Sequence, residues 1–302
     1  MIIRVFKFTK LPQVIAAIII SILIMLAFKN IDNLVAEIYS LSLLVAIFFL
    51  SLFIISKNSI LKNNQYISLG LIIFCGVYFK MPSEINITAS YLFLLLSIRK
   101  IYSLKSKKNQ NKKLFDIGFW YLISIIFNPV NLFFIITILT GIFIFYKISP
   151  VVVLKIVAGM LGATLIALFY FDLTENIQLT QDYFIDIIDQ IWIAYSANDT
   201  FLNQNLDHWL FASISLLIFL YYSFRFFGNN LGERIKNLFL ITFFINSILL
   251  SFVINEYSIF LFFPFLVTLV KIISELKDNL FFETVVLIAI ILNSYPFNFL
   301  TN

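Results

Sequence analysis

Long apolar runs separated by short polar segments follow one another along the whole chain. A helix that crosses a bilayer needs about 20 apolar residues, and these runs are continuous rather than alternating, so they predict helices. We expect an all-α fold, a polytopic transmembrane helical bundle of about eleven spans (range nine to eleven), in a single integral membrane domain over residues 1–302. The predicted spans are 11–28, 40–56, 66–79, 86–98, 116–127, 131–147, 150–171, 209–224, 237–253, 257–273 and 281–296.

The segment 116–147 is interrupted by Asn128 and Pro129, and two topologies follow from this. Proline lacks a backbone N–H and disfavours helix in the residue before it, so the segment forms either a helical hairpin or one kinked span. With the N-terminus in the cytosol, the hairpin places 19 Lys and Arg residues inside and two outside, whereas the kinked span gives 12 and nine. The positive-inside rule therefore favours the hairpin, with a short, protein-covered first arm and a periplasmic C-terminus.

Seven of the 21 Lys and Arg residues lie in the segment Arg99–Lys113, which contains no acid. We assign residues 99–115 to a basic cytoplasmic loop that anchors the topology in a bacterial inner membrane. Binding of anionic lipid head groups is a second role for such a loop. No nucleic-acid partner is expected, because the surrounding sequence forms no fold that would present these charges to one.

The longest polar segment, 172–208, carries seven acidic residues and no Lys or Arg, and we assign it to an acidic periplasmic loop. Within it, residues 181–194 predict an amphipathic interfacial helix on which Asp182, Asp186 and Asp189 form one stripe. Carboxylate oxygens are the ligands that Ca²⁺ and Mg²⁺ prefer, so a metal site at this stripe is one interpretation. The favoured interpretation is the solvated face of a helix lying on the membrane.

The composition of the chain limits the metal, cofactor and transport sites that it can form. Hydrophobic residues make up 61% of the chain and charged residues 12%, against roughly 25% charged in soluble domains. One His and one Cys exclude zinc, haem and iron–sulfur sites, which need several such ligands. We expect no cofactor, with a divalent cation as the alternative. Ion-coupled transporters place ionisable groups within spans, whereas here the charges map to span ends and Asn246 is the clearest strongly polar mid-span residue.

Two segments are similar to parts of the GT-C superfamily of lipid-linked sugar transferases. The residues LFDIGFWYLISIIFNPVNLFF, Leu114–Phe134, resemble the Gly-containing, Pro-split hairpin of that superfamily. The residues EYSIFLFFPFLVTLV, Glu256–Val270, resemble its late span, in which an aromatic residue, here Tyr257, is followed by a proline, here Pro264.

The GT-C resemblance implies a site on the outer face. The superfamily has an acidic catalytic residue in the loop after the first span, and Asp32 occupies that place. The resemblance thus implies Asp32 as the general base toward an acceptor hydroxyl. Lys29 and Lys80, the two outer cations, would then bind the phosphate of the donor.

The chain as a whole most resembles a family of polytopic inner-membrane proteins of Bacteroidota, about 300 residues long. The resemblance depends on the basic N-terminus MIIRVFKFTK, the LFDIGF hairpin and the late FFPFLVTLV span. It implies a location rather than a reaction. We expect a non-catalytic subunit or scaffold of an envelope complex, with membrane lipids and other envelope proteins as partners. The alternatives are a minimal GT-C-like glycosyltransferase that uses a polyprenyl-phosphate-linked sugar at the periplasmic face, and a transporter.

Overall fold

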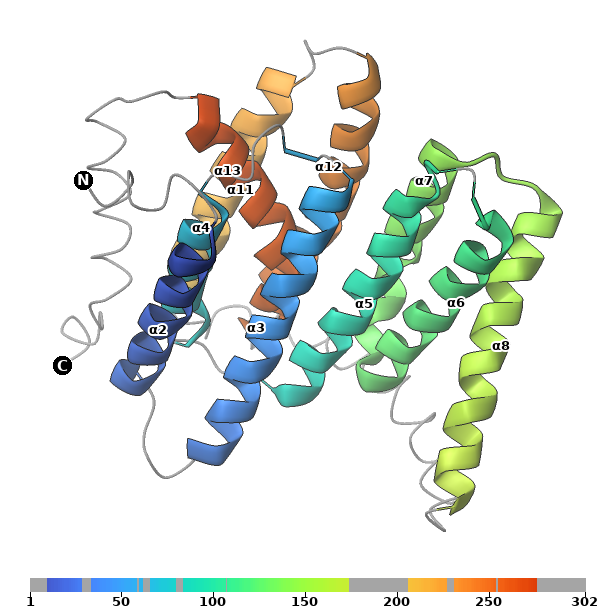
Figure 1. Ribbon diagram of the computed structural model, residues 1–302, viewed down its shortest axis with the longest axis horizontal. Helices are drawn as coiled ribbons and strands as arrows, with labels where there is room; N and C mark the ends of the chain where they lie inside the picture. The colour runs from blue at the N-terminus through green and yellow to red at the C-terminus, as the bar shows by residue number, and fades with distance from the viewer. Residues whose placement is uncertain are drawn as a thin grey trace. The chain divides into compact units, whose positions relative to one another are not determined.

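The structure is a computed structural model and describes residues 10–28, 34–58, 60–61, 66–79, 84–106, 108–173, 206–226, 231–253 and 255–275. These residues form α-helices and short 3₁₀ helices joined by turns, and no strand occurs among them (Figure 1). The chain divides into two compact units, one of Met1–Ile85 with Gln204–Asn302 and the other of Asn86–Asn203, here called unit 1 and unit 2. The all-helical class is therefore confirmed for the described residues.

Unit 2 is a run of consecutive helices with one 3₁₀ turn among them. In chain order they are α5 (Ile85–Ser103), α6 (Gln110–Phe127), the 3₁₀ helix η2 (Pro129–Phe134), α7 (Ile135–Phe145) and α8 (Pro150–Leu173). The predicted loop 99–115 is shorter than expected, since helix continues to Ser103 and resumes at Gln110. Lys, Arg and Gln are good helix formers, so helix extends into the basic segment from both sides.

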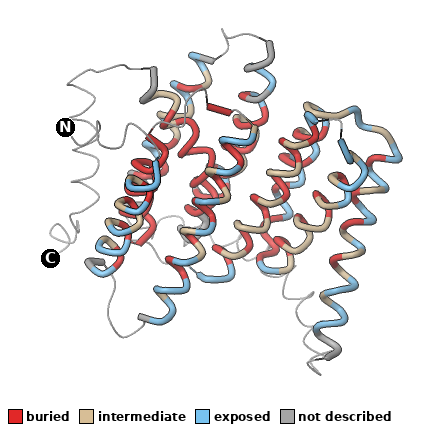
Figure 2. The backbone as a smooth tube through the Cα atoms, viewed as in Figure 1, coloured by how far each residue is buried: buried red, intermediate tan, exposed pale blue. Residues whose placement is uncertain are grey.

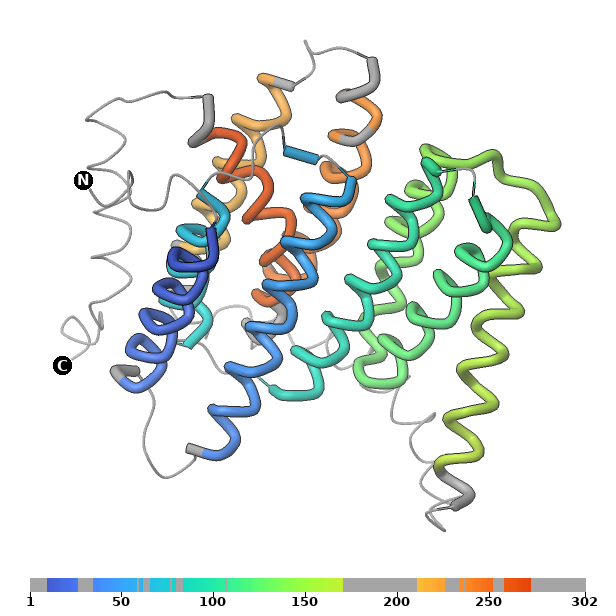
Figure 3. Tube along the Cα trace, viewed as in Figure 1, coloured from blue at the N-terminus to red at the C-terminus, as the bar shows by residue number. Residues whose placement is uncertain are grey.

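The chain reverses direction between α6 and α7, as the hairpin alternative predicts (Figure 3). Lys155, at the start of α8, donates a 2.7 Å hydrogen bond to Asn111, at the start of α6. At the same end of unit 2, the ring of Phe145, which closes α7, lies 5.6 Å from that of Tyr102 near the end of α5. Because α6 starts where α7 ends, the segment between them runs out and back.

Side chains of the reversal fix its geometry. Asn128 leaves the helix with an extended backbone, and its side-chain oxygen accepts a 3.1 Å bond from the amide of Val130. The buried hydroxyl of Tyr121 donates to the carbonyls of Asn131 and Leu132, at 3.2 and 3.0 Å. The Val130 amide is one of the first N–H groups of η2, which have no helical partner, so the Asn128 side chain satisfies it. The Tyr121 hydroxyl ties α6 to the backbone of η2.

Helices α6 and α8 cross with their backbones in contact. A Cβ atom on Gly118 would lie 2.0 Å from the carbonyl oxygen of Ile156, and one on Gly159 would lie 2.0 Å from that of Phe115. No side chain larger than hydrogen fits at either position, since real Cβ atoms essentially never approach within 3.0 Å. Small residues of this kind are common where membrane helices approach closely.

Unit 1 contains the helices from the two ends of the described chain. They are α2 (Leu11–Phe28), α3 (Leu34–Lys57), α4 (Ile67–Tyr78), α11 (Leu206–Phe226), α12 (Leu231–Val253), the 3₁₀ helix η3 (Asn255–Leu261) and α13 (Phe262–Glu275). Its core joins α4, α11 and α13 through aromatic contacts, with the ring of Phe74 at 4.7 Å from Phe262 and 5.9 Å from Phe211. The predicted span 257–273 is divided here between η3 and α13.

Two of the described helices are long and apolar enough to cross a membrane, Val35–Lys57 and Pro150–Tyr170, judged by length and composition. Six further apolar helices in the described residues are shorter, at 10 to 17 residues. The predicted interfacial helix 181–194 and the predicted last span 281–296 lie outside the described residues. The count of about eleven spans, and the single membrane domain, therefore stay predictions.

Candidate functional site

The residues that the sequence singled out for chemistry lie outside the described part of the chain. This holds for the proposed base Asp32, for the proposed phosphate ligands Lys29 and Lys80, and for the acidic stripe Asp182, Asp186 and Asp189. Tyr257 has a 3₁₀ backbone in η3, but its side chain is not described. The roles implied for these residues therefore stay predictions.

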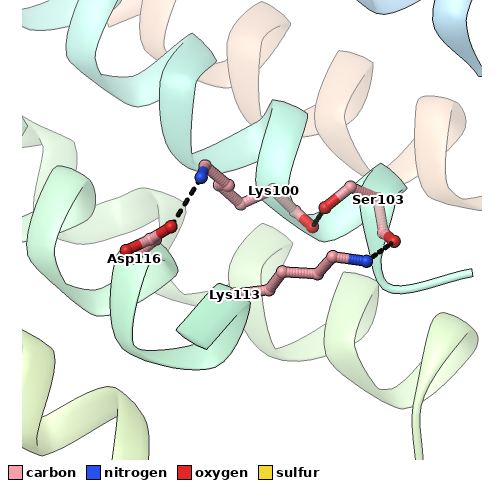
Figure 4. Close-up of polar contacts among 4 residues, drawn as sticks. All are labelled: Lys100, Ser103, Lys113 and Asp116. Atoms are coloured by element: carbon pink, nitrogen blue, oxygen red, sulfur yellow. Dashed lines mark hydrogen bonds and ion pairs between the residues drawn. The ribbon is translucent and has the colours of Figure 1, made fainter. Parts of the chain in front are cut away.

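The described residues contain two polar clusters, and the first lies at the turn between α5 and α6 (Figure 4). Lys100 of α5 forms a 2.5 Å ion pair with Asp116 of α6, with side chains 26% and 19% exposed. Nearby, the Ser97 hydroxyl donates a 3.1 Å bond to the carbonyl of Ile117. A partly exposed ion pair contributes at most about 1 kcal/mol, so its main effect is to fix how the two helices pair.

Lys113 closes the same turn from the other side. Its ammonium group donates to the carbonyls of Ser103 and Ser106, at 2.6 and 2.9 Å, and to the Ser106 hydroxyl at 2.6 Å. Ser103 ends α5 and Ser106 lies three residues beyond it, at a helix end where carbonyls lack helical partners and a cation is favoured. Burial and the positive charge of Lys100 both lower the pKa of Lys113 from its ordinary value.

The other cations of this turn behave differently. Lys105, Lys108 and Lys112 are exposed, and within the part of the chain that the structure describes they form no hydrogen bond or ion pair. Lys147 is also exposed and precedes α8, which begins beside the start of α6. Unit 2 therefore gathers its described cations at one end, here called the basic end.

The second polar cluster joins three helices of unit 1. Lys271 of α13 donates a 2.6 Å bond to the side-chain oxygen of Asn237 on α12 and a 3.1 Å bond to the hydroxyl of Tyr222 on α11. The Tyr222 hydroxyl donates to the same Asn237 oxygen at 2.9 Å. The lysine ammonium also lies 5.4 Å from the centre of the Tyr222 ring, within cation–π range.

Burial makes this second cluster costly to disturb. Tyr222 is fully buried and Asn237 is 3% exposed, and Lys271 is half-buried. Among the described residues, the buried Nδ2 amide of Asn237 has no hydrogen-bond partner, although its oxygen accepts twice. A polar group buried without a partner costs free energy of folding. The stabilising part of Asn237 is therefore its side-chain oxygen, which accepts two hydrogen bonds, and not its amide donor.

The sequence did not predict this cluster. Lys271 lies near the end of the predicted span 257–273 and is one of the 19 cations that the hairpin topology places inside, and Asn246 rather than Asn237 is the polar mid-span residue that the sequence singles out. Tyr222, Asn237 and Lys271 are separated by 15 to 49 positions, and their contacts depend on how three helices pack. A signal that could have found them is a polar residue on the apolar face of each helix.

No group of three or more His, Cys, Asp or Glu side chains that could hold a metal ion occurs among the described residues. The two clusters contain lysine, amide, hydroxyl and a single carboxylate, and their described bonds run mainly between neighbouring helices. Such an arrangement positions helices and presents positive charge. Comparison with known proteins gave no match to this chain, whether with family models, with curated proteins or with solved structures.

Proposed function

We propose that the chain is a multi-pass protein of a bacterial inner membrane that acts as a non-catalytic subunit or scaffold of an envelope complex. The observation that carries the proposal is the surface of α8. This helix has 24 residues, so it is about 36 Å long, enough to cross a hydrocarbon core of about 30 Å. Leu154, Leu161 and Leu165 are 59% to 68% exposed along it (Figure 2).

An apolar surface of this kind is unfavourable in water. Moving one large aliphatic side chain out of water is worth about 1.5–3 kcal/mol, and α8 exposes many of them on the side away from α6. Lipid or another protein in the membrane would cover this surface. The basic end of unit 2 fits the same arrangement, because positive residues favour the cytosolic side.

The two polar clusters support a structural rather than a catalytic role. Lys100 is bonded to a carboxylate on the next helix, and Lys271 is bonded to groups on two other helices. These bonds hold helices together within the unit. The resemblance to inner-membrane proteins of Bacteroidota is part of this proposal, because it implies the same location in the inner membrane.

Labelling of single cysteines tests the topology. In a chain with Cys75→Ser, Lys108→Cys is expected to resist a membrane-impermeant maleimide in intact spheroplasts and to react after permeabilisation, because the basic end is cytosolic. Ser196→Cys, in the predicted periplasmic loop, is expected to react in both conditions. The opposite pattern, with Lys108→Cys reactive in intact spheroplasts, contradicts the proposed orientation.

Variants of the predicted outer site test the role. We expect Asp32→Asn, Lys29→Ala and Lys80→Ala to restore the phenotype of a deletion strain as well as the wild-type gene does, at equal expression. We also expect the wild-type chain to migrate within a larger assembly after extraction in mild detergent. Loss of complementation by Asp32→Asn alone, with a chain that migrates by itself, would support the GT-C-like alternative instead.

A further inference from the structure

The basic end of unit 2 contains two kinds of lysine. Lys100, Lys113 and Lys155 are half-buried and bond to side chains or carbonyls of neighbouring elements. Lys105, Lys108 and Lys112 are exposed, with no bonded partner in the described part of the chain. The lysines of the second kind, like the exposed Lys147, present their charge to whatever surrounds the protein.

Among the described residues of unit 2, no acidic side chain compensates the charge of these three lysines. Asp116 is the one carboxylate whose side chain the structure describes in that unit, and it is paired with Lys100. These three lysines lie within eight residues of chain, on a turn and the first turn of α6. A surface of this kind attracts a partner with several negative charges.

Apolar side chains border the same surface. Phe115 lies three positions after Lys112 on α6 and is 39% exposed, and Val151, the second residue of α8, is 56% exposed. Residues three apart on a helix are neighbours on its surface. Cations next to exposed apolar side chains match the boundary of a bilayer, where charged head groups lie next to acyl chains.

We propose that Lys105, Lys108 and Lys112 form a docking surface for anionic phospholipid head groups, whereas Lys100 and Lys113 hold α5 and α6 together. This inference rests on the proposed function, since it requires the basic end to meet a leaflet. It divides a basic segment that is uniform in sequence into lipid-binding and structural lysines. Lysines near an anionic surface contribute roughly a fivefold gain in affinity each, so about 100-fold for three.

Lipid retention by the full-length chain in detergent tests the proposal. Native mass spectrometry is used to compare dioleoyl-phosphatidylglycerol with dioleoyl-phosphatidylcholine added to the purified chain. We expect the wild type to prefer phosphatidylglycerol, the triple variant K105Q/K108Q/K112Q to lose that preference, and K105R/K108R/K112R to keep it. The size-exclusion profile of each variant shows whether it is folded.

A control variant carries the same change in net charge. K10Q/K57Q/R234Q removes three exposed cations from unit 1, and we expect it to keep the preference for phosphatidylglycerol. Equal loss in this control would overturn the proposal, because the effect would follow net charge. Inorganic phosphate that displaces the lipid at equal concentration would overturn it as well, since the site would then bind any small anion.

The lipid experiment and the labelling experiment fail independently. Retention in detergent does not depend on which side of a membrane the basic end occupies. A Lys108→Cys that is labelled from the periplasm, together with normal retention of phosphatidylglycerol by the wild-type chain, would contradict the topology and leave the lipid surface in place. A cytosolic Lys108→Cys with no lipid preference would contradict the lipid surface alone.

Discussion

Gly159→Ala is expected to lower the thermal stability of the purified chain sharply, because its new methyl group would meet a backbone. The added Cβ would lie 2.0 Å from the carbonyl oxygen of Phe115 and 3.0 Å from the amide nitrogen of Phe119. Neither atom can move without moving α6, so the helices must separate. Overpacking of this kind costs about 3 kcal/mol, and the melting temperature should fall by roughly 10 °C.

Gly162→Ala is the matched control for this prediction. It lies one turn further along α8, where an added Cβ would lie 3.2 Å from the far end of the Phe115 ring, a side-chain atom that can shift. We expect a fall in melting temperature of less than roughly 3 °C. Melting followed by fluorescence-detected size exclusion in detergent measures both variants, and equal melting temperatures would contradict the close crossing of α6 and α8.

Asn237→Ala is expected to destabilise unit 1 by a comparable amount, and Asn237→Asp is expected to restore the stability. Alanine removes the oxygen that accepts from Lys271 and Tyr222, and leaves a half-buried ammonium with one partner fewer. Losing a hydrogen bond to a charged group costs about 1.5–3 kcal/mol. Aspartate keeps the acceptor, adds a negative charge beside Lys271, and removes the buried Nδ2 donor, which has no partner in the part of the chain that the structure describes.

The same melting experiment measures this pair, with a control on the same helix. Thr242 of α12 donates to the carbonyl of Phe239 within its own helix, at 2.8 Å. Thr242→Val removes that bond and should change stability by less than about 1 kcal/mol. If Asn237→Asp melts as low as Asn237→Ala, the acceptor role assigned to the Asn237 oxygen is wrong.

Local pattern predicted several helices closely. The apolar runs 11–28 and 150–171 correspond to α2 and α8 with bounds that agree within two residues. The hairpin between α6 and α7 also follows from local causes, because Pro129 ends the helix and the charges fall on one side. The basic segment was less well predicted, since charged residues with good helix propensity extend both flanking helices into it.

The predicted outer site remains untested, because Asp32, Lys29 and Lys80 lie outside the described residues. Both clusters that the structure does show were beyond the reach of local pattern. The basic segment indicates that positive charge is clustered there. The sequence does not indicate which of its lysines are bonded, such as Lys100 and Lys113, and which are exposed, such as Lys105. The contact of Lys271 with α11 and α12 requires three helices to be placed first.

By itself, the sequence determined the helical class of the described residues, the reversal at Pro129 and the separation of charge along the chain. These properties depend on composition and on neighbours within a few positions. The tertiary structure alone decided that Gly118 and Gly159 meet backbone, and that Lys271 finds partners 34 and 49 positions away. Such contacts depend on how whole helices pack against one another, and the order of residues within each helix does not specify that packing.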